Sequence, residues 1–162
     1  MRHSLLLAAL AVCCVACAQK AVPISEAQLV GKWACGPSFK KVSDGTYEQS
    51  GVTEWHADHT IHGVATTSFT GDKGGWYSMK YYVEDTWRLD GDAIEFTAGT
   101  SKLVSSDPPL SREALEAIKK NAPSDPTSAR YRITAFDGKQ RVMRDDGWFG
   151  NWFGDDYVCR KL

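Results

Sequence analysis

Two cysteines, Cys35 and Cys159, lie near opposite ends of the part of the chain that we expect to fold. Cys35 ends the stretch 29–35, which predicts a first β-strand with Trp33 and Cys35 on one face, because side chains alternate along a strand. Cys159 lies in the last expected strand, 157–160. We expect the two cysteines to form a disulfide, which would tie the first strand to the last, as in a closed β-barrel. The chain-entropy model assigns a closed loop of this length about 4 to 5 kcal/mol.

The remaining cysteines belong to an N-terminal segment that predicts export. A short basic start precedes the apolar run 5–16, and Ala16-Cys17-Ala18 matches the small-x-small pattern of signal peptide cleavage. Val15-Ala16-Cys17 also resembles the end of a bacterial lipobox, in which Cys17 would be lipidated, although Cys14 stands where such motifs usually carry Leu. Both processing routes stay open. We expect residues 1–18 to be a signal peptide and 19–162 to be one domain, in the periplasm or anchored to the outer membrane of a bacterium.

Charge and motifs narrow the classes of function. The net charge is −1 with no clustered basic stretch, which argues against nucleic acid as a partner. We expect contact with a membrane only through an N-terminal lipid anchor. The sequence has no nucleophile elbow, no His-Glu-x-x-His and no phosphate-binding loop, so we expect neither catalytic residues nor a cofactor, and no enzyme activity.

Alternation of apolar and polar residues predicts a mainly β fold with short turns. We expect Gly36-Pro37-Ser38 to end the first strand and Ala98-Gly99 to form a turn. One helix, 112–121, carries an apolar stripe that would pack on an end or flank of the sheet. The expected later strands are 46–56, 76–89, 93–97, 101–105, 130–136, 139–144 and 157–160, with the second arm of a hairpin over 54–62 before a loop at 71–75. Eight or nine antiparallel strands in a meander would close into a small barrel of about eight strands, which removes exposed edges.

The segment 54–62 predicts a tight hairpin with His59 in the left-handed conformation. Trp55 would then face Ile61 in the core. Three residues would share the opposite, solvent-facing side and are weak candidates for metal ligands: Glu54, His56 and His62. Their spacing matches structural zinc patterns only loosely, so we expect no metal site.

The stretch Leu29-Val30-Gly31-Lys32-Trp33 resembles the Gly-x-Trp signature of the first lipocalin strand, and the hairpin 87–94 is similar to those of short bacterial lipocalin-like proteins. This resemblance covers most of 29–162 in pattern but few positions in identity. It implies a barrel that holds one small apolar molecule, with Trp33 closing the base, and it implies no catalytic residue. A typical lipocalin has its helix just before the final strand, whereas here more strands follow 112–121.

The leading hypothesis is an exported barrel that binds an apolar or amphipathic small molecule without catalysis. The candidate ligand-binding residues are aromatic: Trp33, Trp55, Tyr81, Trp87 and Phe96 in the cavity wall, and Trp148, Phe149, Trp152 and Phe153 near its mouth. The alternative is a filled barrel that contacts an envelope protein through the Trp- and Phe-rich loop 145–156. A simpler interpretation of this loop is that two of its four aromatic residues cap the barrel core.

Overall fold

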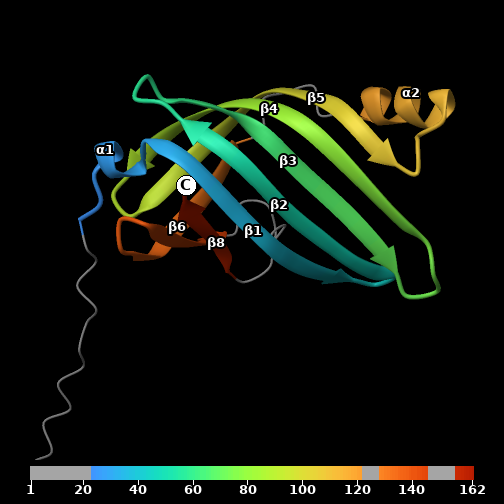
Figure 1. Cartoon of the computed structure of the whole chain (residues 1–162), viewed down its shortest axis with the longest axis horizontal. Coiled ribbons are helices and arrows are strands. Elements are labelled where there is room, and N and C mark those ends of the chain that lie inside the picture. The colour runs from blue at the N-terminus through green and yellow to red at the C-terminus, as the bar shows by residue number, and fades with distance from the viewer. Residues whose placement is uncertain (1–22, 122–127, 146–155) are drawn as a thin grey trace, which may run out of the picture.

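The computed structural model describes residues 23–121, 128–145 and 156–162 and shows a closed antiparallel β-barrel (Figure 1). Each strand pairs with the next one in sequence, and the last pairs with the first. The eight strands are β1 (Gly31–Val42), β2 (Gly45–Trp55), β3 (Thr60–Gly71), β4 (Trp76–Asp90), β5 (Ala93–Asp107), β6 (Ser128–Phe136), β7 (Gln140–Asp145) and β8 (Tyr157–Lys161). The predicted meander, closed into a barrel of about eight strands, is confirmed.

Two helices accompany the barrel, α1 (Glu26–Leu29) and α2 (Arg112–Asn121). The second has its predicted bounds, and the Ser111 hydroxyl accepts a hydrogen bond from the Ala114 N–H at 3.2 Å, which caps the first turn. Figure 1 shows α2 beyond the end of β5. Among the residues described, no helix is both long enough and apolar enough to cross a membrane.

The barrel closes where β1 meets β8. Trp33 pairs with Lys161, Ala34 with Arg160, and Cys35 with Cys159. Cys35 and Cys159 form a disulfide between these two strands, with their Cα atoms 3.9 Å apart and a sequence separation of 124. The predicted disulfide is confirmed, and it joins directly opposed residues of the first and last strands.

The strands differ in length, and this gives the barrel two unlike ends. β1 to β5 have 11 to 15 residues, whereas β6, β7 and β8 have 9, 6 and 5. β5 pairs with β6 only over Ala93–Thr97, and β1 pairs with β8 only over Trp33–Cys35. The remaining parts of β1 to β5 extend past the short strands, as Figure 1 shows. We call these parts the overhang (residues 36–50, 66–80 and 101–107). The opposite end of the barrel, which includes α1, we call the closed end.

Two predicted strand ends are wrong. β1 continues through Gly36 and β5 continues through Gly99, and the pairing register shifts at both places. Gly36 has a φ of +85°, and a Cβ there would lie 2.5 Å from the carbonyl oxygen of Gln49. A Cβ on Gly99 would likewise collide with the carbonyl oxygen of Glu84. Glycine permits a β-bulge for the same reason that it permits a turn, so the two are hard to distinguish from sequence.

The predicted hairpin between β2 and β3 is confirmed. Trp55 pairs with Ile61 and Glu54 pairs with His62, as expected. His59 has a φ of 67°, in the left-handed region, and the His56 N–H donates to the Thr60 carbonyl at 2.9 Å. Trp55 and Ile61 are buried, so this register places the apolar pair in the core.

The core lies at the closed end and is rich in aromatic rings. The Trp55 ring centroid is 5.1 Å from that of Trp87 and 5.3 Å from that of Phe96, in tilted and edge-on arrangements that aromatic rings favour. Trp33 is fully buried, and its indole N–H donates to the Leu29 carbonyl at 2.7 Å. This bond fixes α1 against the base of the barrel.

Candidate functional site

A cavity of about 340 Å³ lies inside the barrel. It begins beside Trp55, Ile61 and Phe96 and extends toward Gln49 and Thr67, at the start of the overhang. Its volume is at the lower end of the range of ligand pockets in proteins, roughly 300 to 1,000 Å³. The barrel interior is therefore not filled entirely by side chains.

Small residues on the inner face create this space. Cys35, Gly51, Ala65 and Tyr81 are consecutive partners across β1 to β4, so their side chains belong to one inward-facing level. Two neighbouring members of that level have no side chain or a single methyl group. A Cβ on Gly51 would lie 2.9 Å from the carbonyl oxygen of Val64, so the close approach of β2 and β3 also requires glycine there.

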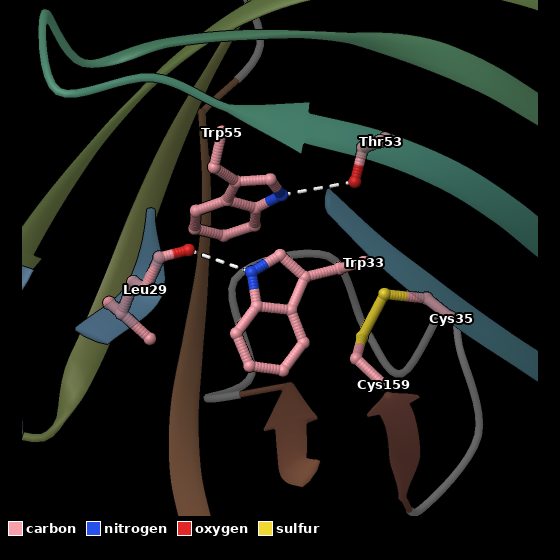
Figure 2. The surroundings of a disulfide bond; sticks show 6 residues. All are labelled: Leu29, Trp33, Cys35, Thr53, Trp55 and Cys159. Carbon is pink, nitrogen blue, oxygen red and sulfur yellow. Dashed lines mark hydrogen bonds between the residues drawn. A yellow bond between two sulfur atoms is a disulfide. The ribbon is translucent and has the colours of Figure 1, made fainter. Parts of the chain in front are cut away.

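At the floor of the cavity Trp55 meets Arg141, and Trp33 lies behind Arg141, outside the lining. The guanidinium carbon of Arg141, from β7, lies 3.8 Å from the ring centroid of Trp55 and 4.3 Å from that of Trp33. Figure 2 shows these two indoles, one from β1 and one from β2, beside the Cys35–Cys159 disulfide. The Trp55 indole N–H donates to the Thr53 hydroxyl at 3.0 Å, which fixes the ring that meets the cavity.

Arg141 is fully buried, with 0% of its side chain surface exposed. None of its three guanidinium nitrogens has a hydrogen-bond acceptor among the residues described. Burial lowers its pKa to about 9, and the nearby Tyr157 hydroxyl acts weakly in the opposite direction. The side chain is still charged at neutral pH. Cation–π contact with two indoles contributes about 2 kcal/mol or more each when desolvated, which offsets part of the several kcal/mol that desolvating an unpaired charge costs.

Three other ionisable groups line the cavity. Burial raises the pKa of the Tyr131 hydroxyl well above its ordinary value and that of Tyr157 to about 12, so both are neutral donors at physiological pH. Burial also raises the pKa of Asp85, which accepts a hydrogen bond from the Gly99 N–H at 3.1 Å. Among these described neighbours, Asp85 is the only acid, and it has its own backbone partner.

The structure separates the predicted wall residues into two groups. Trp55 and Phe96 line the cavity. Trp33 lies beneath Arg141, and Trp87 packs against Trp55 and His59 in the core. Tyr81 faces inward, yet its hydroxyl donates to the Met79 sulfur at 3.0 Å, outside the lining. The predicted mouth residues Trp148, Phe149, Trp152 and Phe153 lie outside the described residues, as does Cys17.

The histidine face lies on the outside of the barrel. The rings of His56 and His62 are 5.3 Å apart, and His62 Nδ1 is 3.8 Å from a Glu84 carboxylate oxygen and 3.4 Å from the Tyr82 hydroxyl. Glu54 is exposed on the same side of β2. Across residues 23–121, 128–145 and 156–162, no group of three or more His, Cys, Asp or Glu side chains is placed to hold a metal ion.

Arg141 was missed from the sequence. It is one of several basic residues near the C-terminus, and a basic residue in a short strand normally faces solvent. The available signal was alternation: Arg141 and Met143 are two residues apart in one strand and therefore share a face. Because Met143 belongs to the core, an arginine on the same face must also point into the barrel.

Comparison with models of known protein families finds no match, and comparison with curated proteins finds no significant match.

Proposed function

We propose that this protein binds an apolar or amphipathic small molecule inside its barrel and carries out no catalysis. The observation that supports this proposal is the interior cavity of about 340 Å³, walled by Trp55, Ile61 and Phe96. A closed barrel gains stability when its interior is packed, so an interior left open suits a ligand. A rigid, largely preformed apolar pocket with few polar groups is the usual form of a small-molecule site.

The disulfide supports an exported location. A disulfide between the first and last strands is typical of an oxidising compartment. We propose the periplasm, or the outer membrane through lipidated Cys17, of a bacterium. Mass spectrometry of the mature N-terminus distinguishes a lipidated Cys17 from simple cleavage, and an uncleaved chain would contradict export.

Filling the cavity tests the binding proposal. Ala65 lines the cavity, and its neighbour Val64 points away from it. Ligand affinity is measured by isothermal titration calorimetry with a panel of medium-chain alcohols and acids. We expect Ala65→Phe to abolish binding and Val64→Phe, the matched control, to preserve it. Binding that survives in Ala65→Phe, or no binding by the wild type, contradicts the proposal.

A further inference from the structure

Asp85 is an unusual residue to find in the wall of an apolar cavity. It lies on β4 two residues from Val83 and two from Trp87, so alternation along the strand points its side chain into the barrel with theirs. The side chain is partly buried, whereas the neighbouring Glu84 and Thr86 are exposed on the outer face. A carboxylate that faces apolar surroundings costs free energy unless its charge is compensated.

The bulge in β5 positions this carboxylate. Glu84 pairs with Thr100 and Asp85 pairs with Ala98, so Gly99 is an extra residue between the two pairs. The Gly99 N–H, which the bulge releases from the ladder, donates to Asp85 Oδ1 at 3.1 Å. Bulges are common beside functional sites, where they re-aim a side chain or a backbone group. Here the bulge fixes one carboxylate oxygen and thereby orients the other.

The second oxygen of Asp85, Oδ2, is open. Among the described residues, Asp85 forms no hydrogen bond besides the one from Gly99, and no ion pair. Oδ2 is not one of the partly buried polar atoms that the protein encloses without a partner, so it keeps accessible surface. Burial raises the pKa of Asp85, and the Gly99 N–H opposes this rise only in part. The carboxylate therefore still has both the space and the charge to accept from a cationic donor.

The other charged group of the cavity wall does not offer such a contact. Arg141 is 0% exposed, and its three guanidinium nitrogens are enclosed where the side chain packs against the indoles of Trp33 and Trp55. Among the described residues, Asp85 is thus the charged side chain that a molecule in the cavity can reach. Its cross-strand neighbour on β3 is Ile61, so the surroundings of its negative charge are apolar.

We propose that the ligand is an amphipathic amine whose ammonium group binds Asp85 Oδ2 while its apolar part occupies the cavity beside Ile61 and Phe96. This inference rests on the proposed ligand-binding function and specifies the chemical class of the ligand. An ammonium N–H donates a charge-assisted hydrogen bond to a carboxylate, and such bonds are about twice as strong as neutral ones. The apolar wall keeps the pair out of water, which strengthens the attraction between the two charges.

The test compares an ammonium with a neutral hydroxyl on the same alkyl chain. Affinities for octylamine and octan-1-ol are measured by titration calorimetry at neutral pH on the wild type, on Asp85→Asn and on Glu84→Gln. Asp85→Asn removes the charge but keeps an oxygen that accepts from the Gly99 N–H. Glu84→Gln is the matched control, because it removes the same charge from the next residue, which is exposed on the outer face and accepts from the Thr100 hydroxyl at 2.9 Å. Circular dichroism checks the fold of each variant.

We expect the wild type and Glu84→Gln to bind octylamine about tenfold or more tightly than octan-1-ol, and Asp85→Asn to lose that preference while still binding octan-1-ol. Equal affinities in the wild type, or a preference that survives in Asp85→Asn, overturn the amine proposal and leave the cavity proposal standing. Binding of neither probe overturns both. Tighter binding of octanoate than of octylamine by the wild type overturns the amine and assigns an anion. If Asp85→Asn fails to fold, the preference is measured on Asp85→Ser, which is expected to lose it as well.

Discussion

The closed end and the overhang contain the same kinds of aromatic residue but use them differently. At the closed end, Trp33 is 0% exposed, donates a hydrogen bond to α1 and lies beside the disulfide. At the overhang, Trp76 is 49% exposed and Phe39 is 59% exposed. Both regions consist of antiparallel ladders. The difference is that, among the strands that the structure describes, only those of the closed end surround the interior on all sides and can enclose a side chain.

This contrast explains where the cavity lies. The closed end is packed around Trp55, Trp87 and Ile94, whereas none of the described residues of β6 and β8 pairs with the overhang. The cavity occupies the region between them, where Gly51 and Ala65 leave the interior unfilled. A binding site thus forms where strands surround the interior but the inward-facing side chains are too small to fill it.

Replacing one tryptophan in each region should produce the largest difference. Trp33→Ala removes a buried ring, its hydrogen bond to Leu29 and its contact with Arg141, so we expect a loss of about 3 to 5 kcal/mol in the free energy of unfolding. Trp76→Ala is the matched control, and its half-exposed ring should cost less than about 1 kcal/mol. Urea denaturation measures both. Similar losses at the two sites would show that the overhang is as well packed as the closed end.

Most of the fold could be predicted from the sequence because its local signals agree with one another. The alternation over 76–89, the hairpin with His59 and the two cysteines all indicate the same barrel. The bulges at Gly36 and Gly99 could not be predicted, because glycine there relieves contact with a neighbouring strand that the local sequence does not reveal. For Arg141, alternation places it on the same face as Met143, but its complete burial could not be predicted. Its burial results from a strand register set by β8 and from two indoles contributed by β1 and β2.

Removing the disulfide tests whether the stability of the closed end depends on the covalent link between β1 and β8. We expect the double variant Cys35→Ala with Cys159→Ala to lose about 2 to 4 kcal/mol in urea denaturation, because the link constrains a loop with a sequence separation of 124. Paired β1 and β8 should keep the fold at 25 °C. Reduction of the wild type by dithiothreitol should reproduce the loss. A change below about 1 kcal/mol would show that strand pairing alone closes the barrel.

The buried charge of Arg141 should make the free energy of unfolding of the ligand-free protein depend on pH in the alkaline range. The pKa of Arg141 is lowered to about 9 in the folded state, whereas an exposed arginine keeps its proton to above pH 12. Between pH 9 and 10 the unfolded chain therefore binds more protons than the folded one, and stability rises with pH. The rise approaches about 1 kcal/mol over that unit. Arg141→Met should lack it.

The other ionisable groups facing Arg141 do not obscure this window. Tyr131 and Tyr157 have pKa values raised by burial, so stability begins to fall as the pH approaches the ordinary tyrosine pKa near 10. Both tyrosines are present in the wild type and in Arg141→Met, so this fall largely cancels in the difference between the two proteins. Burial raises the pKa of Asp85, and this residue too is present in both proteins, so its contribution cancels in their difference. The measurement is the difference between wild type and Arg141→Met in urea denaturation at pH 8, 9 and 10. A difference that is constant across these values would contradict a depressed pKa.

The smallest effect is expected in the overhang, where one aromatic cluster lies on the inner face. Phe69 contacts Tyr47 and Tyr77, with ring centroids 4.9 and 5.5 Å apart, and the Tyr77 hydroxyl donates to that of Tyr47 at 3.3 Å. All three are only partly buried. Tyr77→Phe removes a long hydrogen bond that water can replace, so we expect a loss of at most about 0.5 to 1 kcal/mol in urea denaturation. Phe39→Ser, on an exposed site nearby, is the control and should change stability by less than about 0.5 kcal/mol. If Tyr77→Phe instead costs as much as losing the disulfide, the overhang contains a second core, and the cavity would lie between two packed regions.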